Sequence, residues 1–416
     1  MEINLKLNIP GGKRYEKVSY PVRYGRLAEI NTPDYCFQFN LNGEIKYLKG
    51  TGRDWPHPSE WLKRTPGNHW VYYDSGGYNR IFDYLGEYYL PCFTYGSNSL
   101  WEADPFKEAP VKEALAAFRS LPQALKHSLQ QNNWSTEERA FLLKTIAMDT
   151  RVLEERAGQL IALLQGKVTV LPPDTRHVDY DCIPLIIADG CLYHCSFCRI
   201  KSNQDFKARS RQDILGQLKR IKDLYGPDLR NYNSLFLGQH DALNCCSEEI
   251  VSAALEAYTR LEFERSYLEG SFLFLFGSVD SFLKARESLF EDLNKLPFRT
   301  YLNLGLESAD QECLKLLGKP LTASKVEEAF QRLSEINRSY DRLEVTANFV
   351  VDMKLPPGHW ESLFRLTHDQ FPHYYDKGTI YLSPLSRDGR KELLQRFKEL
   401  KMKSRRPLYL YLIQRL

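Results

Sequence analysis

Three cysteines stand close together near the middle of this 416-residue chain, at Cys191, Cys195 and Cys198. They follow an apolar run at 183–187 that is typical of a buried strand. Thiolates are the usual protein ligands of iron–sulfur clusters and are common ligands of zinc. The spacing therefore predicts a metal-binding loop at the end of a strand, and the rest of the fold must hold that loop in place.

The number of thiols favours an iron–sulfur cluster with one open position. A [4Fe–4S] cluster held by protein alone takes four thiolates, and this loop offers three. The nearest other cysteines are Cys182, before the loop, and Cys245, far downstream. Zinc would require a fourth ligand at short spacing, and His194 lies inside the loop, where it could hardly share the metal. The remaining alternative is a set of reduced core thiols.

The loop resembles the signature of the radical S-adenosylmethionine (radical SAM) enzymes, including an aromatic residue, Phe197, before the third cysteine. The resemblance implies that Cys191, Cys195 and Cys198 bind a [4Fe–4S] cluster whose remaining iron is chelated by SAM. It also implies reductive cleavage of SAM to methionine and a 5′-deoxyadenosyl radical, which abstracts hydrogen from a substrate. A low-potential electron donor such as flavodoxin or ferredoxin would supply the electron.

The composition limits the partners and the compartment that can be expected. Lysine plus arginine total 56 against 53 acidic residues, so the net charge of +3 does not favour a nucleic-acid partner. No apolar run reaches the length of a membrane span, and the first residues do not resemble a signal peptide. The nine cysteines do not suggest a disulfide framework and indicate reduced thiols plus a metal site. We expect a cytoplasmic protein without a membrane partner.

The chain divides into four segments by pattern. Residues 1–104 alternate short apolar and aromatic runs with turn residues, which predicts a β-rich domain with a hairpin at Asn42-Gly43. Residues 105–166 have helical periodicity and are interpreted as a bridge that ends before the paired prolines at 172–173. Residues 181–385 alternate strands with helices, and 386–416 form a basic helix and a last strand that covers a sheet edge or closes the barrel mouth.

The predicted fold class is α/β, a partial (β/α)₆ barrel with a β-rich and helical N-terminal part. Alternation of short apolar runs with helices is the signature of a parallel sheet. Capping boxes predict helix starts at Ser135, with Glu138, and at Ser210, with Asp213. The expected barrel strands are 183–188, 234–237, 272–276, 301–306, 343–351 and 379–382. Their number matches the barrel of the radical SAM family.

Polar residues follow the second and third strands, where βα barrels gather their reactive groups. After the second strand, Gly238, Gln239 and Asp241 partly match the Gly-Gly-Glu-like turn that binds the SAM ammonium in the family. A plain turn between strand and helix is the alternative. Ser278 after the third strand is a candidate for the SAM ribose or carboxylate, or else a helix N-cap.

The fourth and fifth strand ends resemble the coproporphyrinogen-dehydrogenase-like and methylthiotransferase-like branch. By that resemblance Glu307 contacts SAM, and Lys319 neutralises its carboxylate where relatives commonly have arginine. The alternative for Lys319 is a surface charge, and we expect Ser308 with Gln311 to cap a helix. Asn348 is a further candidate SAM contact, or a buried, hydrogen-bonded amide.

These motifs predict a radical SAM enzyme with an unidentified substrate. A small metabolite or cofactor precursor is the first expectation, and an RNA or protein substrate is the alternative. A methylthiotransferase should carry a second set of three cysteines upstream, but only Cys36 and Cys92 precede Cys182. A non-catalytic iron–sulfur or zinc protein on the same scaffold is the remaining hypothesis, and the altered Gly-Gly-Glu turn favours it.

Overall fold

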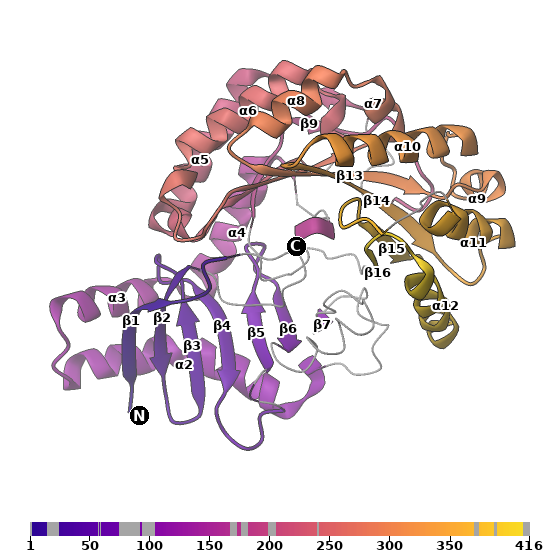
Figure 1. The fold of residues 1–416 in the computed structure, drawn as a ribbon. Coiled ribbons are helices and arrows are strands. Elements are labelled where there is room, and N and C mark those ends of the chain that lie inside the picture. Colours follow the sequence, from indigo (N-terminus) through magenta and orange to yellow (C-terminus); the bar gives the residue numbers. More distant parts are fainter. Residues whose placement is uncertain are drawn as a thin grey trace.

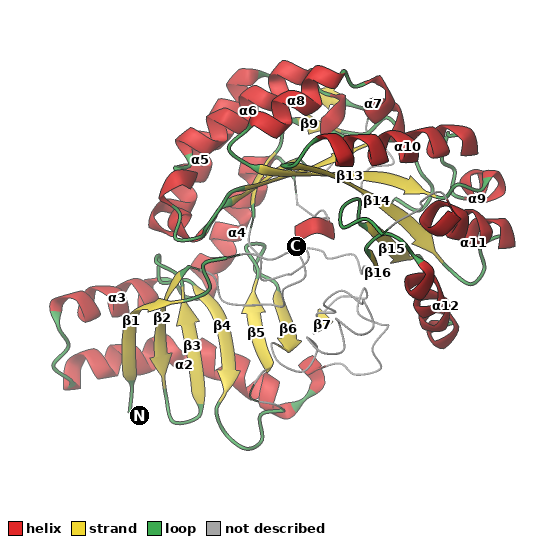
Figure 2. Cartoon of the chain, in the orientation of Figure 1, coloured by secondary structure: helices red, strands yellow, loops and turns green. Residues whose placement is uncertain are grey.

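The computed structural model describes residues 2–14, 25–56, 58, 60–74, 92–93, 105–166, 173–175, 182–198, 205–238, 241–369, 374–386 and 389–410. Two seven-stranded sheets organise these residues, an antiparallel one near the N-terminus and a parallel one that follows it (Figures 1 and 2). Gln239 lies outside the described residues. No helix within these ranges is long and apolar enough to cross a lipid bilayer.

The N-terminal sheet has its strands in sequence order, and each neighbouring pair is antiparallel, as expected for this segment. Its strands are β1 (Asn4–Pro10), β2 (Arg26–Asn31), β3 (Tyr35–Phe39), β4 (Ile45–Gly50), β5 (Glu60–Arg64), β6 (Trp70–Asp74) and β7 (Cys92–Phe93). The predicted hairpin joins β3 to β4, and Gly43 adopts a φ of 79° there. A residue with a Cβ atom rarely adopts that angle, which explains the glycine.

Helices α2 (Ala109–Gln131), α3 (Thr136–Ala147) and α4 (Thr150–Leu164) follow this sheet. Ser135 and Glu138 form the predicted capping box at the start of α3. Helix α2 buries its apolar stripe against one face of the sheet, in a core that includes Ile30, Phe37, Leu48, Leu62, Val111, Phe118 and Leu125. Helix α4 continues toward the parallel sheet, where it packs on α5.

The second sheet is parallel throughout, in the order β16-β15-β14-β13-β12-β11-β8. Its strands are β8 (Ile183–Leu185), β11 (Ser234–Leu237), β12 (Phe272–Gly277), β13 (Arg299–Glu307), β14 (Leu343–Val351), β15 (Ile380–Pro384) and β16 (Leu408–Leu410). All six expected strands are present. Strand β16 pairs with β15 and so covers the edge of the sheet. The run expected at 183–188 ends earlier, because Ala188 leaves the sheet for a separate pairing.

Helices cover the convex face of the curved parallel sheet, and its concave face turns toward the N-terminal sheet (Figure 1). They are α5 (Arg211–Tyr225), α6 (Ser247–Arg260), α7 (Val279–Lys284), α8 (Glu287–Lys295), α9 (Gln311–Leu316), α10 (Ala323–Ser339), α11 (Pro357–Phe364) and the predicted basic helix α12 (Arg390–Lys403). Ser210 caps α5 as predicted, by accepting a hydrogen bond from the backbone N–H of Asp213. This arrangement brings every βα turn to one edge of the sheet.

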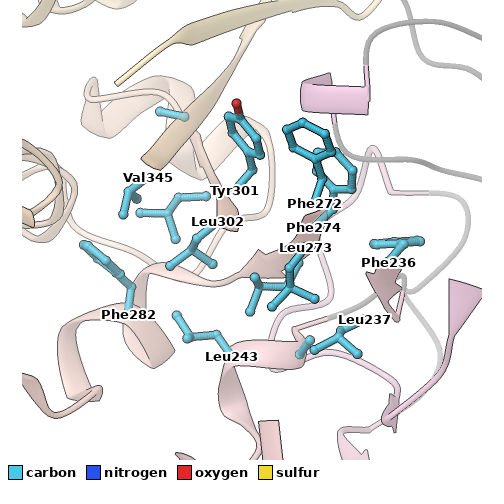
Figure 3. Close-up of a cluster of buried hydrophobic side chains, with 14 of the residues drawn as sticks. Phe236, Leu237, Leu243, Phe272, Leu273, Phe274, Phe282, Tyr301, Leu302 and Val345 are labelled. Carbon is cyan, nitrogen blue, oxygen red and sulfur yellow. The ribbon is translucent and has the colours of Figure 1, made fainter. Parts of the chain in front are cut away.

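The two faces of the parallel sheet bury different side chains. Leu237, Leu273 and Leu302 lie on the side of Leu243 and Phe282, whereas aromatic rings stand on the other side (Figure 3). The rings labelled there are Phe236, Phe272, Phe274 and Tyr301. Each fully buried large apolar side chain contributes roughly 1.5 to 3 kcal/mol, so this core holds the strand ends rigidly.

Candidate active site

The cysteine loop begins where β8 ends, and a small ladder closes its base. Strand β9 (Ala188–Asp189) pairs antiparallel with β10 (Lys207–Ala208), so the two ends of the loop lie side by side. Next to this ladder, the guanidinium of Arg209 donates to both carboxylate oxygens of Asp189, at 2.7 and 2.6 Å, and to the carbonyl of Leu164 at 3.0 Å. Arg209 thus joins the loop base to the end of α4.

The three thiols of the loop are free of disulfide bonds, with Cys195 buried and Cys191 and Cys198 partly buried. Burial raises the pKa of Cys195 to about 11, and the Lys319 ammonium opposes that shift. Among the described residues, no three His, Cys, Asp or Glu side chains form a ready metal-binding group. The fit of an iron–sulfur cluster therefore rests on the chemistry of the donors, three thiols on one short loop, which suits such a cluster.

Two other candidate ligands have partners of their own. His194 Nε2 lies 3.5 Å from a carboxylate oxygen of Asp205, and both side chains are at least half exposed. The thiol of Cys245 is directed at the carbonyl of Ile187, at 3.8 Å, and burial raises its pKa to about 12. Within the part of the chain that the structure describes, His194 and Cys245 therefore each have a partner outside the cysteine set.

Tyr193 ties the loop to the end of β12. Its phenol donates to Oδ2 of Asp280 at 2.7 Å and accepts the backbone N–H of Asp280 at 3.0 Å. Lys325 binds the other carboxylate oxygen at 2.7 Å. Burial acts to raise the pKa of Asp280, but the contacts with Lys325 and Tyr193 outweigh it and keep that pKa below its usual value.

Ser196 ties the loop to the turn after α9. Its N–H and its hydroxyl both donate to the carbonyl of Leu317, at 3.0 and 2.8 Å. Gly318 follows with a φ of 62°, and a Cβ atom there would lie 3.4 Å from Ser196. Phe197 packs beside Leu317 and Cys313. The turn at 317–319 therefore supports the loop from one side.

Glu307 and Lys319 form an ion pair next to this support. The Nζ atom of Lys319 lies 3.3 Å from Oε1 of Glu307 and also donates to the carbonyl of Gly305, and both charged side chains are largely buried. The ammonium stands 5.5 Å from the ring centroid of Tyr193. The alternative of a surface charge at Lys319 is therefore wrong, because its side chain is only 4% exposed.

The turn after β11 contacts the end of β12 instead of projecting freely. Gly238 adopts a φ of 73°, and the buried carboxylate of Asp241 accepts the N–H of Ser278 at 2.9 Å and the hydroxyl of Ser281 at 2.5 Å. Ser278 also caps α7, by accepting the N–H of Ser281 at 3.1 Å. Asp241 and Ser278 are thus neighbours at adjacent strand ends.

Asn348 belongs to a chain of hydrogen bonds across the inner side of the sheet. Its amide donates to Oδ1 of Asn303 at 2.7 Å, and Asn303 donates to the hydroxyl of Thr346 at 2.9 Å. Thr346 and Tyr381 each donate to Asp174, at 2.9 and 2.7 Å. Asp174 lies in a short 3₁₀ helix, Pro173–Thr175, ahead of the barrel. The partly exposed Asn348 is the outermost amide of this chain.

Several residues at the site escaped prediction from the sequence. Tyr193, Arg209, Asp280 and Lys325 anchor the loop, yet the sequence predicted a role for none of them. The position of Tyr193 inside the cysteine loop was the one available signal. The predicted cap of α9 by Ser308 is wrong, because Asp310 accepts the N–H of Cys313 at 2.7 Å and begins that helix.

Residues 185–367 match the family model of the radical SAM superfamily. Among solved structures, a radical SAM methyltransferase from Sphaerobacter thermophilus has a TM-score of 0.37 and 15% identity, over 55% of this chain and 65% of that chain. Streptococcus suis SuiB bound to S-adenosylmethionine has a TM-score of 0.35 and 10% identity, over 85% of this chain and 71% of that chain.

Two curated relatives are ribosomal protein uS12 methylthiotransferases RimO from Aeromonas species. The protein of Aeromonas salmonicida is 25% identical over 54% of this chain and 52% of its own length. The protein of Aeromonas hydrophila is 26% identical over 47% of this chain and 41% of its own length. The chain thus spans about half the length or less of the curated relatives that it matches.

Proposed function

The chain belongs to the radical SAM superfamily, and from this premise we propose that Cys191, Cys195 and Cys198 hold the [4Fe–4S] cluster that the family implies. When bound, the cluster supplies the electron that splits SAM into methionine and a 5′-deoxyadenosyl radical, which abstracts hydrogen from the substrate. The observation that carries the proposal is the placement of three thiols on one loop, which Tyr193 ties to the end of β12 and Ser196 ties to the turn after α9.

The amino-acid part of SAM carries an ammonium and a carboxylate, and Glu307 with Lys319 offers the complementary charges. We assign the carboxylate of Glu307 to a polar contact with SAM and the ammonium of Lys319 to neutralising the SAM carboxylate. The two side chains lie 3.3 Å apart beside Tyr193 of the cysteine loop, and both are largely buried. This supports the assignment, because charge-assisted hydrogen bonds from SAM to either group would be strong in such a site.

The other SAM contacts in the proposal are residues that follow β11 and β12 in sequence, together with one residue of β14. Gly238, Gln239 and Asp241 take the place of the Gly-Gly-Glu-like turn, Ser278 is assigned to the ribose or carboxylate, and Asn348 to a further polar contact. The hydrogen bond between Asp241 and Ser278 supports a shared surface for β11 and β12. A residue that anchors a turn can still offer a second lone pair to a ligand.

The substrate in the first form of the proposal is a small metabolite or cofactor precursor. The near-neutral net charge of +3 argues against a nucleic-acid substrate. A protein substrate is the second candidate, because the curated relatives are named as enzymes that modify a ribosomal protein.

The experiment is anaerobic. The cluster is reconstituted on the full chain, a reductant and SAM are added, and 5′-deoxyadenosine is quantified. We expect about four iron atoms with matching sulfide per chain, and production of the nucleoside by the parent chain. Cys198→Ala removes one expected ligand and should abolish both, whereas the exposed Cys246 is a matched control whose Cys246→Ala change should alter neither.

Two results would contradict the proposal. One zinc per chain without acid-labile sulfide would indicate a zinc protein on this scaffold. A full cluster without nucleoside and without measurable SAM binding would indicate a non-catalytic iron–sulfur protein. A full cluster that binds SAM and forms nucleoside only after a cell extract is added would instead support the proposal and begin the search for the substrate.

A further inference from the structure

Glu307 occupies a backbone conformation that needs external support. Its φ is 65°, in the left-handed region that non-glycine residues rarely adopt, and the pairing of β13 with β14 shifts register between Gly305 and Glu307. The carboxylate folds back over its own strand, since a Cβ atom on Gly305 would lie 2.6 Å from Oε1 of Glu307. This conformation brings the carboxylate to Lys319, and strain of this kind persists only where the surroundings enforce it.

Ser308, the next residue, is held by a histidine from another element. Its hydroxyl lies 2.8 Å from Nδ1 of His359, and both side chains are fully buried. The same hydroxyl oxygen accepts the backbone N–H of Asp310 at 3.0 Å. We assign the hydroxyl as the donor and Nδ1 of the neutral His359 ring as the acceptor of this bond. Burial lowers the pKa of His359 to about 4, which agrees with a neutral ring.

The segment that carries His359 also presses directly on the turn after Glu307. His359 lies in α11, which follows β14, and a Cβ atom on its neighbour Gly358 would lie 2.7 Å from Oδ2 of Asp310. Asp310 in turn caps α9. Helix α11 therefore packs against the end of β13, and among the described residues its side-chain hydrogen bond to Ser308 comes from His359.

We propose that His359 is a positioning residue for SAM binding, which accepts the hydrogen bond of Ser308 and so holds Glu307 in its left-handed conformation with its carboxylate toward Lys319. The inference rests on the contact between Glu307 and SAM proposed above. His359 itself touches neither SAM nor the reacting atoms. It acts through the backbone of the turn, as outer residues orient the ligands of metal sites.

The test compares SAM affinity among variants of the reconstituted full-length protein. His359→Leu keeps an apolar volume but removes the acceptor, and His359→Asn places an oxygen near the position of Nδ1. We expect His359→Leu to weaken SAM binding by about 10- to 100-fold, the range found for residues that orient a site from outside. His359→Asn should stay near the parent value. His368→Leu, the same change at a half-buried histidine in the π-helical turn that follows α11, is the matched control.

Two further measurements separate positioning from general stability. Ser308→Ala removes the donor with little change in volume and should weaken SAM binding as much as His359→Leu, and the double variant should be no weaker than either. If His359→Leu fails to fold, Ser308→Ala carries the test. Amide hydrogen exchange at 305–310 of the chain without cofactors should become faster in both variants, while exchange in the core strand β12 stays unchanged.

The inference is overturned if His359→Leu and Ser308→Ala bind SAM like the parent. It is also overturned if His359→Asn is as defective as His359→Leu, because packing and not the hydrogen bond would then be responsible. Failure of the proposed function has a different signature, since the parent protein itself would bind no SAM.

Discussion

Tyr193 and Asp280, 87 positions apart in sequence, exchange two hydrogen bonds at 2.7 and 3.0 Å. The pair joins the middle of the cysteine loop to the first turn of α7, and Lys325 completes it from α10. The orientation of the thiols therefore depends on the end of β12, a strand that is not adjacent to β8 in the sheet.

Tyr193→Phe should loosen the loop without unfolding the protein. The change removes a hydrogen bond to a charged partner, which contributes about 1.5 to 3 kcal/mol to the free energy of unfolding. Iron retained per chain at limiting iron should fall about tenfold, since the loop is less well ordered. Urea unfolding and iron analysis measure the two effects. Tyr258→Phe, which alters a tyrosine that packs by its ring on Phe298, should change neither.

Arg209→Met should destabilise the base of the loop. The guanidinium is 6% exposed and binds both oxygens of Asp189, so its loss leaves that carboxylate and the carbonyl of Leu164 without their partner. We expect a loss of about 2 to 4 kcal/mol in the free energy of unfolding, somewhat less than for a fully buried pair. Denaturant unfolding is the measurement. The exposed pair of Arg14 with Glu269 supplies the control, because Arg14→Met should change stability by less than about 1 kcal/mol. Equal losses at both sites would contradict the prediction.

The lowered pKa of the buried His359 predicts that the protein loses stability in acid. Burial lowers its pKa from 6.5 to about 4, opposed by the backbone of Val350 and the charge of Asp310. Between pH 4 and pH 6.5 the unfolded chain binds a proton at this histidine and the folded protein does not. The contribution of His359 to the free energy of unfolding is therefore fully present above pH 6.5 and decreases toward pH 4. The contribution lost is about 3 kcal/mol. The difference in unfolding free energy between the parent and His359→Asn should change by this amount across that range, and a constant difference would refute the assignment.

Asp228 predicts the opposite trend at the contact between the two sheets. It accepts hydrogen bonds from the side chain of Asn40 at 2.9 Å and the backbone of Leu41 at 3.3 Å, both from the β3–β4 turn. Burial raises its pKa from 3.8 to about 7, which the nearby Lys46 partly opposes. The folded protein then holds a proton that the unfolded chain releases. Its stabilising contribution is therefore full below pH 3.8 and declines as pH rises through 7.

Asp228→Asn tests this trend. The amide cannot ionise, so relative to the parent the variant should gain on the order of 2 to 4 kcal/mol in unfolding free energy as pH rises from 4 to 8. Chemical denaturation at several pH values, with the parent and the variant side by side, provides the difference. If the unfolding free energy of the variant instead decreased relative to the parent as pH rises, the ionised carboxylate of Asp228 would be the stabilising form.

Features set by neighbours in sequence were predicted well. The capping box at Ser135, the N-cap at Ser210 and the Asn42-Gly43 turn depend on residues within one turn of each other, and the structure has all three. At Ser210 the return bond of the predicted box is missing, because the Asp213 carboxylate accepts the Ser210 hydroxyl instead. The strands of the parallel sheet were predicted because burial on both faces requires long apolar runs. Helix α9 is the exception, because Ser308 and Asp310 both stand where a cap can form, and a distant histidine binds Ser308.

The sequence by itself determined the three thiols, their shared loop and the strands of the parallel sheet, since burial follows from the periodicity of apolar residues. Only the tertiary structure decided which side chains hold that loop. Tyr193 finds Asp280, Arg209 finds Asp189, and Ser308 finds His359 because strand ends remote in sequence meet at one edge of the sheet. A polar side chain has many partners of suitable chemistry in the sequence, and the register of the strands selects one of them.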